Sequence, residues 1–328
     1  AASPAPPAAL REAAGAAVAE AEGEGGTRRA AAPAAAAPAP NARLGQGVFA
    51  SVRLSKGQDG KQIAVKTYDH RAVKDRAVHA HMQNEERLAG RLNHDNIIVP
   101  HAVRRHRGRT ELEMEYAPGG NLGEYVKEQA SKGGLPEDEA RRLFSQIVDA
   151  VHYLHDKKDI AHRDIKLENI VLDKEHNARL VDFGAAREGA NVFRQSMQGT
   201  PAYMAPEVAQ GHAHRGAAAD VWSLGVLLYN LLTKGAFPFW GKSMDELRRN
   251  IMLSTPKIPG NLSPGCRDLL SKLLNKSAAA RMSVADVRRH PWVASGMREP
   301  PAGPATHQQQ QAQQAQQLQA AQQQQQQQ

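Results

Sequence analysis

Cysteine is almost absent from this sequence, whose 328 residues include only Cys266. A single thiol cannot form a disulfide within the chain, which is typical of a protein from a reducing compartment. The four Glu residues between positions 12 and 24 argue against an organelle transit peptide. We therefore expect an intracellular protein, cytoplasmic or nuclear.

Aromatic residues and long apolar runs are also scarce. Phe, Trp and Tyr make up 5% of the chain, which leaves few rings to stack on bases. The longest apolar run, 221–232, is interrupted by polar residues and is shorter than the roughly 20 residues that a membrane-spanning helix needs. We predict a buried helix there, and we expect neither a nucleic-acid nor a membrane partner.

Both ends of the chain have a biased composition. The first 40 residues hold 19 Ala and 6 Pro, and residues 308–328 are almost entirely Gln with a few Ala. Such segments bury too little apolar surface to offset the conformational entropy lost on folding. We therefore predict disordered segments at 1–41 and 294–328, on either side of one folded unit at 42–293.

Basic residues exceed acidic ones, and the formal net charge is +8. The surplus belongs to the central part, because the two ends carry about as many acidic as basic residues. We interpret the densest basic run, at 104–109, as a solvated loop. A nucleic-acid-binding protein is an alternative that depends on this run and the net charge alone.

Within the central part, the patterning changes from strand-like to helix-like. Short β-favouring runs separated by turn signals fill 48–65, a segment with helical spacing follows at 72–92, and 112–116 resembles one more strand. Pro118-Gly119-Gly120 then indicates a hinge.

Beyond residue 120, apolar residues recur at helical spacing over 136–154, and helical patterns dominate as far as Trp292. The expected fold class is α+β. A small antiparallel β lobe with one main helix would occupy about 42–116, and a larger, mostly α-helical lobe about 117–293.

Two close glycines, Gly45 and Gly47, mark a turn between the first two predicted strands. Such a turn can bring backbone N–H groups up to phosphate oxygens, although a pair of glycines is more often only a hairpin turn. Lys66 ends an apolar strand downstream and is, by itself, typical of a strand edge. Neither feature alone predicts a function.

Two later segments carry residues suited to phosphate and metal chemistry. Asp164, Asn169 and Asp182 are two carboxylates and an amide, the hard oxygen ligands that Mg²⁺ bridging phosphates requires. The alternative interpretation makes them loop caps and turn residues. The segments read His162-Arg163-Asp164-Ile165-Lys166-Leu167-Glu168-Asn169 and Leu180-Val181-Asp182-Phe183-Gly184.

Taken together, these segments resemble the eukaryotic protein kinase family over nearly all of 43–293. Three further segments support the resemblance: Gly199-Thr200-Pro201-Ala202-Tyr203-Met204-Ala205-Pro206-Glu207, Asp220-Val221-Trp222-Ser223-Leu224-Gly225, and Arg281 ahead of His290-Pro291-Trp292. Within the family, 164–169 and 199–208 are similar to the calcium/calmodulin-dependent and AMP-activated group. The resemblance implies a bilobal serine/threonine protein kinase that uses ATP and Mg²⁺ on Ser/Thr hydroxyls of protein substrates.

The resemblance also implies roles for the polar residues of both segments. Asp164 is expected to orient the substrate hydroxyl and accept its proton, and Lys166 to neutralise charge on the transferred γ-phosphoryl group. Asn169 and Asp182 are expected to ligate Mg²⁺. Lys166 together with Thr200 is the serine/threonine pattern rather than the tyrosine pattern.

For the nucleotide, the resemblance implies that Lys66 holds the α- and β-phosphates and that Glu85 pairs with it. Glu85 is preferred to Glu86 because it lies nine residues before His94, as in similar kinases. Met114 corresponds to the gatekeeper. The remaining residues expected around ATP are Leu44, Gly45, Gln46, Gly47, Val48, Ala50, Val52, Ala64, Glu115, Ala117 and Val171.

Three implied roles are structural. Thr200 is expected to bond to Asp164 and Lys166, and Asp220 to brace the catalytic loop through its backbone N–H groups. Glu207 and Arg281 are expected to form a buried ion pair, the loss of one partner of which costs about 3–5 kcal/mol. The residues with structural roles are thus Arg163, Thr200, Glu207, Asp220 and Arg281.

Regulation is implied by Arg163, beside the catalytic Asp. In similar kinases this Arg binds a phosphate on the activation loop, which corresponds to 182–207 in this sequence. Ser196 matches the usual phosphosite, so we expect activation by phosphorylation, from an upstream kinase or in trans.

Some positions depart from the family pattern. Ala50 stands where a third glycine is usual, and Ala89 stands where a larger apolar residue normally packs on Phe183, which predicts a small void. Asn121 and Asn230 occupy places where basic-directed relatives carry acids. A pseudokinase scaffold is therefore a second reading, although its motif residues are intact.

Overall fold

The computed structural model describes residues 42–46, 50–70, 76–194 and 199–297. The predicted disordered segment 1–41 lies outside the described residues, as does 298–328 of the second one. Gly47, Val48 and Ser196 also lie outside them. Residues 294–297 continue from the last helix, and Met297 packs against the main core.

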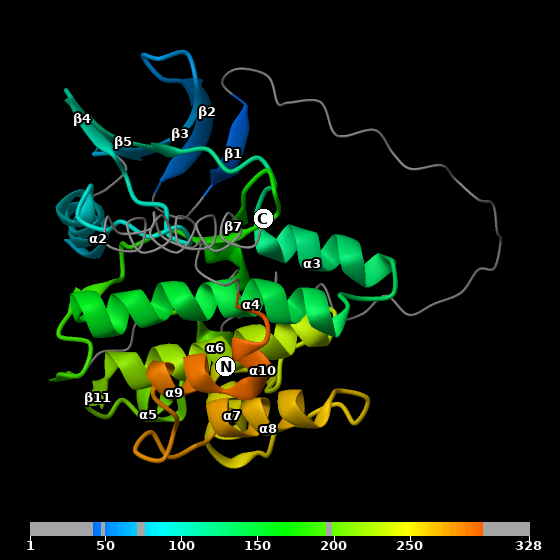
Figure 1. Cartoon of the computed structure of the whole chain (residues 1–328). Helices are drawn as coiled ribbons and strands as arrows, with labels where there is room; N and C mark the ends of the chain where they lie inside the picture. The colour runs from blue at the N-terminus through cyan, green and yellow to red at the C-terminus, as the bar shows by residue number, and fades with distance from the viewer. Residues whose placement is uncertain (1–41, 47–49, 71–75, 195–198, 298–328) are drawn as a thin grey trace, which may run out of the picture.

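A five-stranded antiparallel sheet and one helix form the first part of the chain (Figure 1). These elements are β1 (Arg43–Gln46), β2 (Ser51–Lys56), β3 (Gln62–Asp69), α2 (Arg76–Leu88), β4 (Ala102–His106) and β5 (Arg109–Glu115). The strand order is β1-β2-β3-β5-β4. Tyr68 and Leu112 of the sheet pack against Val78 and Met82 of α2, which fixes the helix against the sheet.

The basic run at 104–109 is part of the β4–β5 hairpin, so the expectation of a solvated loop was wrong. Arg104 pairs in register with Glu111, and Arg105 with Thr110. β4 is an edge strand whose last three residues are exposed and charged or polar. Such strands lack the apolar alternation by which a strand is recognised in a sequence, because their pairing depends on the neighbouring strand.

The second part of the chain is mostly helical. Its elements are α3 (Leu122–Ser131), α4 (Glu137–His152), η1 (Tyr153–Lys157), β6 (Ile160–Ala161), η2 (Leu167–Asn169), β7 (Ile170–Leu172), β8 (Ala178–Leu180), β9 (Arg187–Glu188), β10 (Phe193–Arg194), η3 (Pro201–Tyr203), α5 (Pro206–Ala209), β11 (His214–Arg215), α6 (Gly216–Leu232), α7 (Met244–Leu253), α8 (Pro264–Leu273), α9 (Val284–Arg289) and α10 (Pro291–Ala294). The predicted buried helix at 221–232 is confirmed as the larger part of α6. Trp222, Leu224 and Val226 on it are fully buried.

The two parts meet where the chain leaves β5. The backbone N–H of Gly119 donates to the carbonyl of Leu172 on β7 at 2.9 Å. A Cβ atom at Gly119 would lie 2.7 Å from the Cβ of Leu172, so this close approach requires glycine. Leu88 and Ile97 belong to the same core cluster as the large-lobe helices, so the end of α2 is packed against the second part.

These elements confirm the predicted α+β architecture, with a small antiparallel β lobe carrying one main helix and a larger helical lobe. Among the described residues, no helix combines the length and the apolar character needed to cross a membrane.

Candidate active site

A buried ion pair joins the sheet to α2. Lys66 Nζ on β3 lies 2.9 Å from Glu85 Oε1 on α2, and the Tyr68 hydroxyl donates to the other Glu85 oxygen at 2.8 Å. Glu85 is 2% exposed. Because the pair is shielded from water, it fixes the direction in which the Lys66 ammonium points.

The same ammonium reaches Asp182 Oδ1 at 3.2 Å. Burial alone would lower the pKa of Lys66, but the charges of Glu85 and Asp182 outweigh it and raise that pKa well above its usual value. Burial would raise the pKa of the Asp182 carboxyl, but Lys66 holds it well below its usual range. At neutral pH, the site therefore presents a cation beside an anion.

The loop that carries Asp182 lies close against α2. Asp182 has a left-handed backbone, with φ of 64°. A Cβ atom at Gly184 would lie 2.6 Å from Nδ1 of His81 on α2. Glycine at this position therefore allows the loop to approach the helix that holds Glu85.

Three residues meet around Asp164. Thr200 Oγ1 donates to Asp164 Oδ1 at 3.0 Å and accepts from Lys166 Nζ at 2.9 Å. Lys166 Nζ also lies 2.8 Å from Asp164 Oδ2, and Asn169 Nδ2 donates to that oxygen at 2.9 Å. Both oxygens of Asp164 are thus held, which fixes the orientation of the carboxylate.

Asp220 on α6 supports this loop. Its Oδ1 accepts from the backbone N–H of Arg163 at 2.7 Å, and its Oδ2 accepts from that of His162 at 2.8 Å. His155 Nε2 lies 2.8 Å from the same Oδ2. Arg163 has a φ of 69°, a conformation unusual for a non-glycine residue, and these bonds hold it there.

The ring of His162 meets the ring of Phe183 edge-on, with centroids 5.0 Å apart. Phe183 is 1% exposed and belongs to the main core cluster. Ala89, beside which the sequence predicts a void, is half-buried just after α2. Phe183 is therefore buried by contacts with the main core, including the His162 ring, although Ala89 offers only a methyl group.

Glu207 and Arg281 form a two-bond ion pair in the large lobe, with N···O distances of 2.7 and 3.0 Å. Arg281 also donates to the backbone carbonyls of Asn275 and Ala218. Its side chain is fully buried, so the pair is isolated from solvent. Such a pair positions α5 rather than contacting a reacting group.

The residues expected around a nucleotide lie in both lobes. Val52 pairs in register with Lys66, and Ala64 with Met114, so these four meet in the middle of the sheet. Val171 lies on β7 in the large lobe. Of the others, Leu44, Gly45 and Gln46 lie on β1, Ala50 precedes β2, Glu115 ends β5 and Ala117 follows it.

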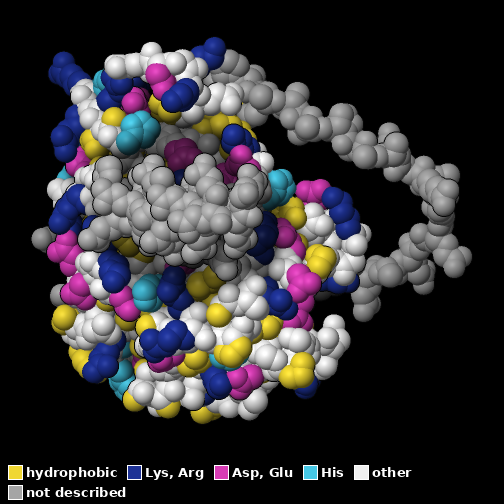
Figure 2. Space-filling model, in the orientation of Figure 1, with side chains coloured by type: hydrophobic (Ala, Val, Ile, Leu, Met, Phe, Trp, Pro, Cys, Tyr) yellow, Lys and Arg dark blue, Asp and Glu magenta, His cyan; other side chains and the backbone are white. Residues whose placement is uncertain are grey.

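The basic hairpin is largely neutralised by acidic side chains. Its ion pairs are Arg104–Glu113, Arg105–Glu86, His106–Glu111 and Arg109–Glu111. On the face shown in Figure 2, basic and acidic side chains are interspersed over the described surface. The hairpin therefore offers no concentrated positive charge.

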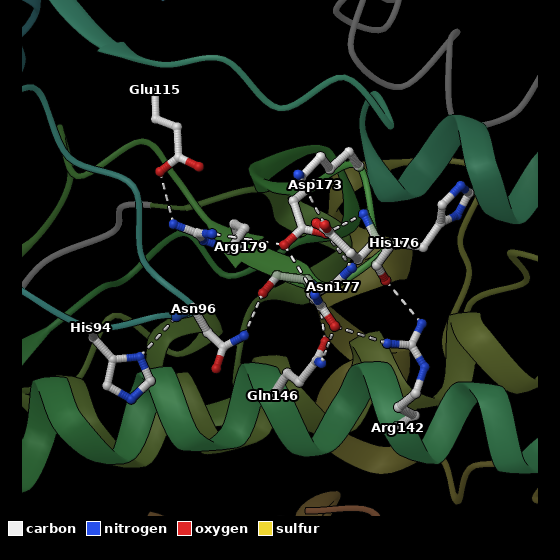
Figure 3. Close-up of polar contacts among 12 residues, drawn as sticks. His94, Asn96, Glu115, Arg142, Gln146, Asp173, His176, Asn177 and Arg179 are labelled. Carbon is white, nitrogen blue, oxygen red and sulfur yellow. Dashed lines mark hydrogen bonds and ion pairs between the residues drawn. The ribbon is translucent and has the colours of Figure 1, made fainter. Parts of the chain in front are cut away.

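The sequence does not predict the polar network that lies between α4 and the end of β5 (Figure 3). Arg179 on β8 pairs with Glu115 at 2.9 Å and lies 3.8 Å from Asp173. Asn177 accepts from Gln146 on α4 at 2.9 Å. No local pattern predicts this network, because its members come from three elements far apart in the chain.

Comparison with known proteins identifies the family. Residues 39–293 match the family described as Protein kinase domain. The chain is 37% identical to Maternal embryonic leucine zipper kinase of Xenopus tropicalis over 257 residues, which are 77% of this chain and 38% of that protein. It is 36% identical to NUAK family SNF1-like kinase 2 of Homo sapiens over 254 residues, 77% of this chain and 40% of that protein.

A plant relative gives a similar result. CBL-interacting protein kinase 21 of Oryza sativa subsp. japonica is 34% identical over 254 residues, which are 76% of this chain and 47% of that protein. The chain thus spans less than half the length of these three curated relatives. With the family match covering both lobes and every cluster described above, the chain belongs to the protein kinase domain family.

Proposed function

We propose that this chain is an active serine/threonine protein kinase, which transfers the γ-phosphoryl group of ATP to Ser/Thr hydroxyls of protein substrates. The observation that carries the proposal is the arrangement of Asp164, Lys166, Asn169 and Thr200 around one fixed carboxylate. Little covalent chemistry is required of the protein in phosphoryl transfer, so positioned charges of this kind supply most of the catalysis.

In this mechanism, Asp164 orients the acceptor hydroxyl and accepts its proton as the oxygen attacks the γ-phosphorus. The bond from the γ-phosphorus to the bridging oxygen breaks, and ADP leaves with that oxygen. Lys166, 2.8 Å from Asp164, is placed to neutralise the charge that accumulates on the transferred group.

Protein kinases generally use ATP with Mg²⁺, and the donors here suit that ion. Asp182 offers a carboxylate, and Asn169 offers its amide oxygen because its nitrogen already donates to Asp164. Among the described residues, no group of three His, Cys, Asp or Glu side chains is placed to hold a metal. Mg²⁺ commonly takes one or two protein ligands and completes its shell with phosphates and water. When bound, it would neutralise phosphate charge.

Lys66 is the residue we propose for the α- and β-phosphates, held in place by Glu85. We propose that adenine lies between Leu44, Val52 and Ala64 on one side and Val171 on the other, with Met114 as gatekeeper. The backbone of Glu115 and Ala117 would bond to its edge. Gly45, Gln46, Gly47, Val48 and Ala50 would cover the phosphates.

Substrate preference follows from the polar groups beside the catalytic loop. Glu168 is exposed on this loop. Asn121 accepts from the backbone N–H of Glu124 at the start of α3, and Asn230 is fully buried. Because Asn121 and Asn230 are neutral, Glu168 is the one of these three side chains that favours a basic residue in the substrate, which is a weak preference.

The test is phosphate transfer from Mg-ATP to a mixed Ser/Thr peptide library. We expect transfer by the wild-type chain, loss of at least two orders of magnitude in Asp164→Asn, and no loss in Asp156→Asn. Asp156 is a matched control because its carboxylate is on η1 and contacts His152. Nucleotide binding without transfer, even after loop phosphorylation, would favour the pseudokinase reading.

We also propose that phosphorylation of Ser196, by an upstream kinase or in trans, activates the protein. Arg163, Arg187 and His214, groups that attract a phosphate, line a hollow together with Val192 of the same loop. Treatment with an activating kinase should raise the activity of the wild type and not that of Ser196→Ala. Full activity in Ser196→Ala would refute this part of the proposal.

A further inference from the structure

One buried side chain of α2 has no part in the mechanism above. Asn84 precedes Glu85 and is 6% exposed. Its amide nitrogen donates to the carbonyl oxygens of Phe183, Gly184 and Ala186 at 2.7, 3.2 and 2.6 Å. A helix residue thus contacts three backbone carbonyls within five residues of Asp182.

The orientation of this amide is fixed by its other atom. Arg87 donates to Asn84 Oδ1 at 2.9 Å, and Arg87 itself pairs with Glu188 on β9. Carbonyl oxygens and a guanidinium can be satisfied only if the nitrogen faces the loop and the oxygen faces Arg87. The chemistry of the partners therefore rules out the flipped amide.

Asn84 adds a donor to carbonyls that have few others: the Phe183 oxygen also accepts from the backbone N–H of Ala186, and the Ala186 oxygen also accepts from the Arg187 guanidinium. A carbonyl oxygen accepts and never donates, and leaving it buried without a donor is costly. A carboxylate of the same shape at position 84 would place negative charge against three oxygens. Asn84 therefore supplies donors that neither Asp nor an apolar residue can replace.

Besides the Arg87–Glu188 ion pair, two separate connections link α2 to the part of the loop beside Asp182. Glu85 reaches Asp182 through the Lys66 ammonium, and Asn84 binds the backbone that follows Asp182. The first connection changes whenever Lys66 moves to a phosphate. The second involves no group that contacts a nucleotide, so it can persist through the reaction.

We propose that Asn84 is a positioning residue that couples α2 to the Asp182 loop, so that Glu85 and Asp182 move as one unit. The catalytic consequence of this coupling rests on the proposed function, whereas the coupling itself does not. Loss of Asn84 should free the loop and the helix together, and it should reduce activity by lowering the population of the arrangement in which both carboxylates are placed.

Hydrogen–deuterium exchange tests the coupling independently of catalysis. In Asn84→Ala, we expect the backbone amides of both Arg76–Leu88 and 182–190 to exchange about 10-fold faster, because the hydrogen bonds that join the two segments are lost. Asn84→Asp should show a larger effect, and Asn84→Ser, which keeps one donor, a smaller one. Gln83→Ala, at the exposed neighbouring position, is the matched control and should show none.

Unchanged exchange in either segment would overturn the inference, and so would a uniform rise across the large lobe, which reflects general destabilisation. The same variants should lose kcat/KM in the order Asp, Ala, Ser, by about 10-fold for Ala. If the wild type transfers no phosphate, the proposed function fails, and the exchange result still decides the role of Asn84.

Discussion

The carboxylate of Glu115 and the guanidinium of Arg179 lie 2.9 Å apart, which ties the last residue of β5 to β8 in the other lobe. Glu115 is about half exposed, whereas Arg179 is mostly covered and also faces Asp173. The backbone of Glu115 is proposed to bond to adenine. The ion pair therefore restrains the segment that we propose contacts the nucleotide.

Removing this restraint should speed nucleotide release. An ion pair of this exposure is worth roughly 0.2–1 kcal/mol, so we expect Arg179→Gln to raise the dissociation rate of a fluorescent nucleotide about 2- to 5-fold. Stopped-flow displacement measures it. Lys174→Gln, which removes an exposed cation from the β7–β8 turn, is the control, and an equal rate in both variants would contradict the prediction.

Thr200 bridges Asp164 and Lys166 through one hydroxyl. Thr200→Val keeps the shape and removes the hydroxyl, so kcat should fall about 10-fold with little change in the KM for peptide. Thr200→Ser should restore most of the rate. Steady-state kinetics on the three proteins check this, and a Ser variant as slow as Val would show that the hydroxyl is not the cause.

Arg281 should be essential to stability rather than to chemistry. Arg281→Met leaves Glu207 as an unpaired, mostly buried carboxylate, which costs about 3–5 kcal/mol in the free energy of unfolding. The double variant Glu207→Leu/Arg281→Met should recover at least half of that loss. Urea unfolding of the single and double variants provides the measurement, and identical losses would argue against charge burial as the cause.

Asp149 on α4 predicts a specific pH dependence of stability. The hydrogen bond from His94, together with Arg288, lowers the pKa of its carboxyl from 3.8 to about 2. A depressed folded-state pKa stabilises the fold fully above about pH 4, and this contribution is lost as the pH falls through 2.

Asp149→Asn should therefore lower the free energy of unfolding by about 1 kcal/mol at pH 7, allowing for the partial exposure of the pair. The difference from the wild type should shrink as the pH falls below 4. Glu175→Gln, at an exposed carboxylate of the β7–β8 turn, should show neither effect in the same titration. A difference that stays constant with pH would exclude the carboxylate as its source.

The single thiol should be inert until the large lobe unfolds. Cys266 is fully buried, and burial raises the pKa of its thiol to about 12. We expect no reaction with a thiol reagent at pH 8 under native conditions and one equivalent of reaction in denaturant. Measured against urea, labelling should follow the loss of helix signal, and earlier labelling would reveal a partly open lobe.

Local patterns and motifs predict the two lobes, but they do not predict elements that depend on contacts between distant parts of the chain. The run at 221–232 predicts a buried helix because most of its residues are apolar, and it forms the larger part of α6. β4 escapes prediction because its exposed side chains follow no alternation. Its arginines form ion pairs with Glu113 on β5 and Glu86 on α2, which the sequence of β4 itself does not reveal.

The site shows the same division. Residues 162–169 and 180–184 can be placed by motif, and the structure brings Lys66, Glu85 and Asp182 within hydrogen-bonding distance. Asn84 has no signal of its own, because a polar residue beside Glu85 in a helix is equally typical of a solvated face. Its contacts with the loop are visible only in the folded structure.

The closure of α4 determines when the protein can fold during synthesis. Glu137 at its start accepts from the indole N–H of Trp292 at 2.8 Å, and Ser145 donates to the carbonyl of Val293 at 2.9 Å. These partners leave the ribosome about 150 residues after the helix itself. The catalytic loop is therefore translated well before its lobe can close, so a nascent chain halted before residue 292 carries the motifs but lacks the partners that close α4.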